Sequence, residues 1–464
     1  MKIDHPNTSQ FDRRECLRRG AGVLLAGTAL HTAASGAQAE EESPKPVRIG
    51  VIGLGGRGRY LMQSLASNHP GVVITALSEL KPDRLKVAAD IVKNRTGASP
   101  AEYCGGEHEY RKMLERDDVD GVLVATGVQK FANISVDCMK AGKDVGTEVS
   151  GPYTIDDCWA IVEEKERSGR HYMLLEQCSY GDDVLLILNM IKKGLFGEPY
   201  YAECSYVHDI KTGGGGKSRF VEEDGSLSWR GRLIAEGRGS SYPPHGIAPV
   251  SKMMGINDGD RFEYCNAMMS APREIRAQLV EQFGPDSDAA KIKIQTGDFH
   301  STFIYTAKGR MIRLDYSLSS TRPYSRYYLL QGMNGCYDSR TGVFVKGLSK
   351  ESTPGYGTWS PVSDFQEEYR HPLWRKDGEA ALKTGGHGGM DHFCLRDFVD
   401  MIRYDREPWN DCYDAAAWNA LNQCSEMSID KKGAPVEIPD FTKGKWQNPD
   451  WRKGRPSPAS MIES

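Results

Sequence analysis

Two side chains that can carry protons lie three residues apart, Tyr242 and His245, in the segment Tyr-Pro-Pro-His. An imidazole changes charge near neutral pH, and a phenol accepts a proton when a neighbouring positive charge lowers its pKa. Pro243 and Pro244 stiffen the segment, which predicts a braced loop that points both side chains into one cavity. The pair therefore predicts proton transfer. For His245 alone, the alternative is a structural imidazole that is hydrogen-bonded within a loop.

A glycine-rich turn indicates a second kind of chemistry. The apolar run 47–52 leads into Gly53, Gly55 and Gly58, spaced G-x-G-x-x-G. In this pattern the first glycine makes a tight turn, the second lets the backbone approach a pyrophosphate, and the third lets a helix pack closely. Glu79 ends the next apolar run. In this pattern, an acidic residue at that position binds the ribose of a dinucleotide. Because a carboxylate repels a 2′-phosphate, NAD is favoured over NADP. A structural turn without a ligand is the alternative.

The elements that must position these residues fall into two groups. Over 47–178, apolar runs alternate with helix-like segments, which predicts a doubly wound parallel sheet, a Rossmann domain. Its ligands would bind beyond the carboxyl ends of the strands. Over 179–464, alternating polar and apolar runs predict an α+β domain with a large, mainly antiparallel sheet and C-terminal helices. An exposed face of such a sheet often pairs with its copy, which suggests a homo-oligomer.

Residues 1–39 have the organisation of a twin-arginine export signal. Arg13 and Arg14 precede a short run of small and apolar residues, and Ala37-Gln38-Ala39 has the form of a cleavage site. The run is too short to span a bilayer, although a retained membrane anchor is the alternative. Residues 40–46 read as a polar linker. We expect a periplasmic or secreted protein that has no membrane contact after the signal is cleaved.

Composition narrows the functional classes. The contents of 39% hydrophobic and 26% charged residues are typical of a soluble globular protein, and a net charge of −4 provides no basic field for nucleic acid. The eleven cysteines form no C-x-x-C pair and no Cys/His cluster with zinc spacing, so no metal is predicted. Folding in a reducing compartment before export predicts free, mostly buried thiols. Since NAD is recycled in the cytoplasm, an exported NAD protein needs an external electron acceptor or a redox-neutral cycle.

Several longer motifs occur in order along the chain: 146–151, 188–198, 206–209, 229–230, 242–246, 322–324, 387–391 and 433–442. Together they resemble the sugar oxidoreductase superfamily of glucose-fructose oxidoreductase and the inositol dehydrogenases. Within that superfamily the chain is similar to glycoside hydrolase family 109, the NAD-dependent α-N-acetylgalactosaminidases. Dehydrogenases of the superfamily have Glu-Lys-Pro where this chain has Glu148-Val149-Ser150. Val149 cannot act as an acid or base, and the hydrolase branch also has valine there.

The resemblance implies hydrolysis by transient oxidation of the sugar. NAD would take a hydride from C3, a base would remove the C2 proton, the aglycone would leave from C1, water would add, and the hydride would return. This cycle is redox-neutral, as an exported enzyme requires. The substrates implied are N-acetylgalactosaminides. An oxidoreductase that only transforms the sugar at C3, and a sugar-binding protein without turnover, are the alternatives.

The resemblance also implies roles for single residues. Tyr242 and His245 would transfer protons. The resemblance does not assign which of the two acts at C2 and which at C3. The expected substrate contacts are Tyr206, Arg230, Tyr242, Pro243, Pro244, His245 and Tyr324. The expected cofactor contacts are Gly53, Gly55, Gly56, Arg57, Gly58, Glu79, Val128, Gln129, Lys130, Phe131, Glu148, Val149, Gln177 and Tyr242. The chain departs from the family at two places. Residues 128–131 are Val-Gln-Lys-Phe where family members have Trp-Glu-Trp-His, and Pro244 also differs from the family residue.

Purely structural roles are the alternatives for several of these residues. Tyr206 could face the core as a strand residue, Arg230 could be a surface charge beside a core tryptophan, and Arg57 could be a solvated charge at a helix start. His208 and Asp209 are a candidate orienting pair.

Overall fold

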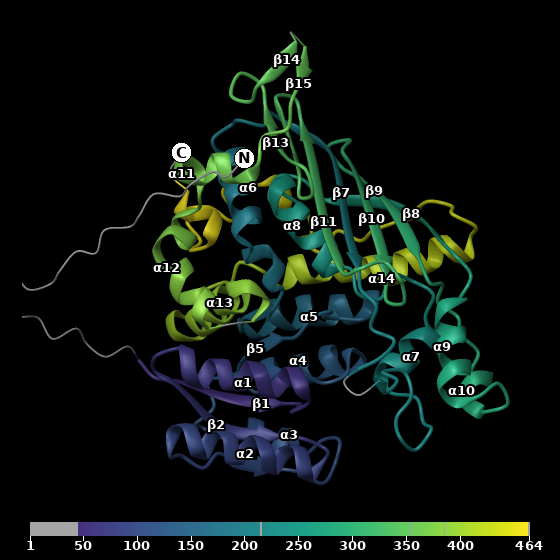
Figure 1. Ribbon diagram of the computed structural model, residues 1–464. Coiled ribbons are helices and arrows are strands. Elements are labelled where there is room, and N and C mark those ends of the chain that lie inside the picture. Colours follow the sequence, from purple (N-terminus) through teal and green to yellow (C-terminus); the bar gives the residue numbers. More distant parts are fainter. Residues whose placement is uncertain (1–44, 214–215, 354, 385, 463–464) are drawn as a thin grey trace, which may run out of the picture. The chain divides into compact units, whose positions relative to one another are not determined.

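The computed structural model describes residues 45–213, 216–353, 355–384 and 386–462. The predicted signal and most of the predicted linker therefore lie outside the described residues. Pro44–Ser464 form one compact unit, which contains a six-stranded sheet, an eight-stranded sheet and a two-stranded hairpin (Figure 1). No helix in the described ranges has the length and apolar character needed to cross a bilayer.

The six-stranded sheet is parallel, and its strand order is β3-β2-β1-β4-β5-β6. This order confirms the predicted doubly wound fold. The order reverses where β1 pairs with β2 on one side and β4 on the other, and a crevice for a ligand opens at such a point. The strands are β1 (Val47–Ile52), β2 (Val72–Ser78), β3 (Ala101–Tyr103), β4 (Gly121–Val124), β5 (Asp144–Thr147) and β6 (Tyr172–Leu174).

Helices connect these strands and cover the sheet. They are α1 (Gly56–Asn68), α2 (Pro82–Thr96), α3 (Tyr110–Leu114), α4 (Phe131–Lys140) and α5 (Ile155–Ser168). Thr154 caps α5 in a capping box: its hydroxyl accepts from the N–H of Asp157, and the Asp157 carboxylate accepts from the N–H of Thr154. α1 begins at Gly56, so the glycine-rich turn already contains the first helical residues.

The eight-stranded sheet has the order β13-β12-β11-β7-β10-β9-β8-β16. Only β7 and β10 pair in parallel, so the predicted, mainly antiparallel sheet is confirmed. The strands are β7 (Pro199–Val207), β8 (Phe262–Met269), β9 (His300–Thr306), β10 (Met311–Ser317), β11 (Ser325–Gly332), β12 (Gly335–Asp338), β13 (Gly342–Val345) and β16 (Val436–Glu437), with β14 (Glu351–Thr353) and β15 (Tyr356–Gly357) in the hairpin.

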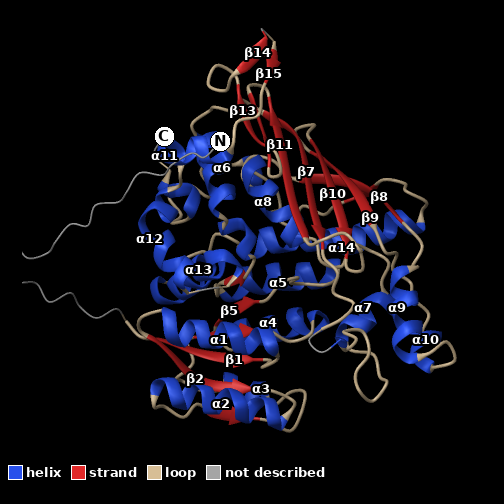
Figure 2. Ribbon diagram, in the orientation of Figure 1, coloured by secondary structure: helices blue, strands red, loops and turns tan. Residues whose placement is uncertain are grey.

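Helices cover one face of the eight-stranded sheet, as Figure 2 shows for α8 and α14. Side chains of β9 alternate between buried and more exposed, which is the pattern of a sheet with one open face. The remaining helices are α6 (Asp182–Lys192), α7 (Trp229–Glu236), α8 (Pro244–Met254), α9 (Glu274–Phe283), α10 (Asp288–Lys291), α11 (Gln366–Tyr369), α12 (Pro372–Lys383), α13 (Met390–Tyr404) and α14 (Cys412–Asp430).

The two C-terminal helices complete both layers. α13 packs against the parallel sheet so closely that a Cβ on Gly146 of β5 would lie 2.7 Å from the ring of Phe398. α14 packs on α5 on one side and on β8 on the other, and Figure 1 shows it between them. The end of the chain therefore supports the cofactor domain as well as the second sheet. All ten described cysteines are free, and eight of them are buried.

Gly58→Ala should destabilise the protein, because α1 leaves no room for a side chain at this position. A Cβ on Gly58 would lie 2.0 Å from the carbonyl oxygen of Gly53, so the backbone must shift. Overpacking of this kind costs about 1–3 kcal/mol of the free energy of unfolding, and the Tm should fall by several degrees. Gly56→Ala is the matched control on the same helix, since no atom lies within 4 Å of its Cβ. Equal Tm values in thermal denaturation would contradict this packing.

Candidate active site

Two neighbouring cavities lie at the carboxyl ends of the parallel strands. They share Gly55, Ala125, Thr126 and Trp229 in their walls. One, of about 530 Å³, contains the glycine turn and Glu79, and we call it the nucleotide cavity. The other, of about 350 Å³, contains Tyr242 and His245, and we call it the reaction cavity. The strand-end rule therefore places the predicted cofactor residues and the predicted proton carriers side by side.

The nucleotide cavity fits NAD. No atom lies within 4 Å of a Cβ built on Gly55 or Gly56, so the turn leaves space for a pyrophosphate, and no side chain caps the N-terminus of α1. The Glu79 carboxylate accepts hydrogen bonds from the backbone N–H groups of Leu54 (2.7 Å) and Lys81 (3.1 Å), which fixes it at the end of β2. In the reaction cavity, the amide oxygen of Gln177 is buried without a partner among the described residues and can accept a hydrogen bond.

Arg57 does not point freely towards a phosphate. Its Nε donates to Glu148 (2.7 Å), and its Nη1 and Nη2 donate to both oxygens of Asp391 (2.9 and 2.8 Å). His387 Nδ1 lies 2.9 Å from the same aspartate. Burial opposes ionisation of Asp391, but hydrogen bonds from Arg57 and His387 outweigh burial and hold its pKa well below the usual range. Arg57 thus joins α1, the β5 end and α13, and it lines the reaction cavity from this fixed position.

The four residues 128–131 divide between two roles. Lys130 lines the nucleotide cavity and forms an ion pair with Glu107, and Phe131 lines the reaction cavity. Val128 is buried and lines neither cavity. The Gln129 side chain lines neither cavity, and it donates to the backbone oxygen of Trp229 (3.2 Å). Lys130 and Phe131 are therefore placed where they can contact the cofactor, Gln129 holds α7 at the site, and Val128 belongs to the core.

The loop predicted around His245 was wrong. Pro243 is the N-cap residue of α8 and Pro244 is its first residue, so His245 stands in the first helical turn. A proline suits this position because its fixed φ is helical and the N–H it lacks would be unpaired there. Both prolines are buried and line neither cavity, so they position His245 and are not placed as substrate contacts. The helix gives His245 a more rigid base than a loop would.

Tyr242 is a proton donor in this structure. Its hydroxyl donates to the backbone oxygen of Val149 (2.7 Å), and its ring lies 5.3 Å from that of His245. Burial, reinforced by the charge of Glu148, raises the pKa of Tyr242 far above its usual value. Burial and Glu148 thus act against the lowered pKa that was expected beside a positive charge. At neutral pH, Tyr242 can donate a hydrogen bond but cannot act as a base.

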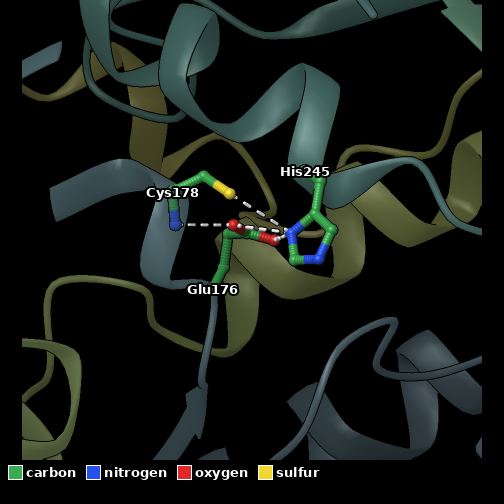
Figure 3. A group of neighbouring side chains, drawn as sticks. All are labelled: Glu176, Cys178 and His245. Carbon is green, nitrogen blue, oxygen red and sulfur yellow. Dashed lines mark hydrogen bonds and ion pairs between the residues drawn. The ribbon is translucent and has the colours of Figure 1, made fainter. Parts of the chain in front are cut away.

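His245 is paired with a buried carboxylate that the sequence did not indicate. Its Nδ1 donates to Glu176, with nitrogen–oxygen distances of 2.8 and 3.0 Å, and Figure 3 shows Nε2 on the far side of the ring. Burial alone would lower the pKa of His245, but the Glu176 charge outweighs it and raises the pKa to about 10. The same pairing lowers the pKa of Glu176 against the effect of burial. The resting pair is imidazolium and carboxylate.

Cys178 completes the group in Figure 3. Its backbone N–H donates to Glu176 (2.8 Å), and its Sγ lies 3.4 Å from His245 Nδ1. These three side chains could in principle hold a metal ion, and the sequence prediction named no metal. However, Arg326 Nη1 lies 2.9 Å from the sulfur, and a guanidinium at this distance opposes a cation. The group is better explained as a support for His245.

An aromatic wall surrounds the proton carriers. The Tyr206 ring stacks on Tyr242 (5.4 Å between centroids) and meets His245 edge-on (4.9 Å), so Tyr206 lines the reaction cavity rather than the core alone. Tyr324 is half exposed and contacts Tyr206 and His208, although it does not line the cavity itself. The proposed pair of His208 and Asp209 is not formed, because the partner of His208 Nδ1 is the Tyr206 hydroxyl (2.9 Å).

Sequence reasoning missed five residues of the site: Glu176, Cys178, Arg219, Asp391 and Arg326. One of them carried a usable signal, since Glu176 follows β6 and the strand-end rule had already selected its neighbour Gln177. The other four come from distant segments. His387 lines the reaction cavity while it also supports Asp391.

The fold and the site define a class of protein. A doubly wound parallel sheet is joined to a mainly antiparallel sheet, and the reaction cavity presents Val149 and His245, which is paired with Glu176. Among solved structures, the chain is similar to an oxidoreductase from Agrobacterium radiobacter in complex with NAD+, L-tartaric acid and magnesium. The TM-score is 0.60 at 15% identity, over 85% of this chain and 99% of that one. This likeness shows the fold.

Sequence comparison identifies the family. The model "Oxidoreductase family, NAD-binding Rossmann fold" matches residues 47–175, and "Glycosyl hydrolase 109, C-terminal domain" matches residues 180–448. A glycosyl hydrolase family 109 protein from Solibacter usitatus is 37% identical over 86% of this chain and 89% of its own length. An alpha-N-acetylgalactosaminidase from Shewanella oneidensis is 33% identical over 94% of this chain and 97% of its own length. The chain belongs to glycoside hydrolase family 109 and is an NAD-dependent glycoside hydrolase.

Proposed function

We propose that this enzyme hydrolyses N-acetylgalactosaminides, or glycosides with a closely related sugar, by transient oxidation at C3. The observation that carries the proposal is the reaction cavity, where a histidine–carboxylate pair and a protonated tyrosine lie beside the cofactor residues. The name of the Shewanella relative supports the choice of sugar. Val149 supports hydrolysis over net oxidation, because no lysine stands beside the reacting hydroxyl.

The chemistry divides between the cofactor and the protein. When bound, NAD+ would accept a hydride from C3 of the sugar while the C3 hydroxyl gives its proton to water, and both would be returned at the end of the cycle. The resulting C3 carbonyl makes the C2 proton acidic. We assign the removal of that proton to Nε2 of His245, because Nδ1 is held by Glu176 and Tyr242 cannot accept a proton. Tyr242 then donates a hydrogen bond to the C3 oxygen as it gains negative charge.

Elimination and rehydration complete the cycle. Loss of the C2 proton expels the aglycone from C1, and His245, now protonated, is placed to return a proton when water adds. Between these two proton transfers, Glu176 stabilises the His245 imidazolium. Because the pKa of His245 is raised to about 10, the neutral base becomes more abundant as pH rises. The rate should therefore increase from neutral towards alkaline pH.

The decisive experiment follows both the aglycone and the C2 proton. Purified protein, with no added cofactor, is incubated in deuterated water with nitrophenyl α- and β-glycosides of N-acetylgalactosamine. We expect nitrophenol release, with deuterium at C2 of the freed sugar by NMR. Release without deuterium would exclude elimination. Reduction of supplied NAD without nitrophenol release would identify a C3 oxidoreductase instead.

We also propose that the enzyme is exported through the twin-arginine route. The support is the signal-like sequence of residues 1–39, with Arg13 and Arg14, and the redox-neutral cycle that an exported NAD enzyme needs. Fractionation of a bacterial host that expresses the full chain should place the enzyme in the periplasm with its N-terminus near Glu40. Arg13→Lys combined with Arg14→Lys should retain it in the cytoplasm. An unchanged distribution would contradict this route.

A further inference from the structure

Two guanidinium groups face the reaction cavity without an acidic partner, those of Arg230 on α7 and Arg219 just before it. Within the part of the chain that the structure describes, neither side chain takes part in a hydrogen bond or an ion pair. Arg230 is partly buried, and its guanidinium carbon lies 4.0 Å from the centroid of the Trp229 ring. No side-chain nitrogen of Arg230 is fully buried without a hydrogen-bond partner. Since these nitrogens have no partner, they remain accessible from the cavity.

The other cations at this cavity have carboxylate partners. Arg57 is held by Glu148 and Asp391, and the His245 imidazolium is held by Glu176. Among the described residues, Arg219 and Arg230 are the arginines of this cavity that form no ion pair. Burial lowers the pKa of Arg230, and the like charge of Arg219 lowers it further, but an arginine stays charged. A partly buried, unpaired cation is costly, so this cavity has its lowest free energy when an anion binds.

The two unpaired guanidinium groups lie on the sugar side of the site. His208, whose pKa is lowered by burial and then by the charge of Arg219, bonds Tyr206 and contacts the ring of Tyr324. Arg230 lines the reaction cavity together with Tyr206 and Tyr242. Gly55 and Gly56 of the pyrophosphate turn also line the reaction cavity, whereas Glu79 and Gly53 line the nucleotide cavity. Because neither Arg219 nor Arg230 lines the nucleotide cavity and both share the reaction cavity with Tyr206 and His208, we assign the anion to the substrate.

We propose that the natural glycoside carries an anionic substituent, a carboxylate or a sulfate ester, on or beside the ring that is oxidised, and that Arg219 and Arg230 bind it. This inference rests on the proposed function and specifies its substrate class. A guanidinium presents paired N–H donors that match the oxygens of a carboxylate or sulfate. Arg230, stacked on Trp229, supplies a fixed fork, and Arg219, which is exposed, closes over the same group.

The test compares neutral and anionic forms of one sugar. The kcat/KM values are measured for nitrophenyl N-acetylgalactosaminide, its 6-sulfate and its 6-carboxylate (the nitrophenyl N-acetylgalactosaminuronide), and binding of the three free sugars is measured by calorimetry. We expect the sulfated sugar or the uronide to be preferred at least tenfold over the neutral sugar at low salt. The preference should shrink at high salt, because ions screen the two guanidinium groups. Whichever anionic sugar is preferred identifies the substituent.

Variants connect the preference to these side chains. Arg219→Gln and Arg230→Gln should each reduce the ratio of anionic to neutral kcat/KM about tenfold, which corresponds to about 1.4 kcal/mol. The matched control is Arg232→Gln, an exposed arginine of α7 that lines neither cavity, and it should leave the ratio unchanged. The NAD content of each purified variant is measured in parallel.

The outcomes separate this inference from the proposed function. Cleavage of all three glycosides without an anionic preference would overturn the inference and leave the glycosidase function standing. Tighter, salt-dependent binding of an anionic sugar without cleavage of any glycoside would support the inference and remove the proposed function. Loss of NAD from the arginine variants with an unchanged sugar preference would also overturn the inference, since the guanidinium groups would then serve the cofactor phosphates.

Discussion

Replacing His245 with glutamine is expected to lower kcat/KM for glycoside cleavage by about 10²–10⁴-fold, the range that a positioned general base contributes. Glutamine has no basic nitrogen at the position of Nε2, so the C2 proton should no longer be removed. Deuterium incorporation at C2 should fall together with nitrophenol release. NAD content should stay close to that of the wild type, because the nucleotide cavity contains no atom of His245.

A second buried histidine provides the control for His245→Gln. His300 lies in β9, its Nε2 contacts Thr296 (3.1 Å), and it lines neither cavity. Burial lowers the pKa of His300 to about 4, so it is neutral and has no paired carboxylate of the Glu176 kind. His300→Gln should keep the wild-type rate even if it lowers the Tm. If His245→Gln retains more than about a tenth of the wild-type rate, His245 is not the general base of the reaction.

Replacing Glu176 with glutamine should move the pH dependence of the rate to lower pH. Without the carboxylate, burial becomes the dominant influence on His245 and its pKa falls from about 10. The limb of the kcat/KM profile that reports His245 should therefore shift by several pH units, and the weaker base should lower the limiting rate about 10–100-fold. A residue with a purely structural role would lower the rate without moving the limb. Glu176 is a positioning residue in this scheme.

Glu176→Gln should also destabilise the protein, by an amount that depends on pH. His245 has a raised pKa, so its contribution to stability is full below about 6.5 and is lost as pH rises through about 10. Glu176 has a lowered pKa, so its contribution is present above about 4.5 and is lost in acid. Breaking a buried pair costs about 3–5 kcal/mol. The difference in Tm between wild type and Glu176→Gln should be largest near pH 5–6 and smaller towards pH 10.

Glu222→Gln is the control for Glu176→Gln, since Glu222 is exposed and lines neither cavity. It should change neither the position of the limb nor the Tm. An unshifted limb in Glu176→Gln, combined with a wild-type rate, would contradict the assigned pairing of His245 with Glu176. A shifted limb together with retained NAD would support it.

The sequence by itself determined the cofactor site. Gly53, Gly55, Gly58 and Glu79 are specified by spacing along one strand–turn–helix unit, and local chain geometry places them together wherever that unit folds. The alternation of strands and helices likewise determined the doubly wound sheet. Tyr242 and His245 could be found for the same reason, because three residues of chain separate them and any compact local structure keeps them close.

Only the tertiary structure decided what those side chains can do. Glu176 is 69 residues from His245 in the sequence, and Asp391 is 334 residues from Arg57, so no local pattern links either pair. Burial and a neighbouring carboxylate decide that Tyr242 remains protonated and that His245 is charged at rest. Both effects depend on how the two sheets and α13 enclose the cavity. Local spacing therefore encodes which groups are present, whereas packing of distant segments sets their charges and partners.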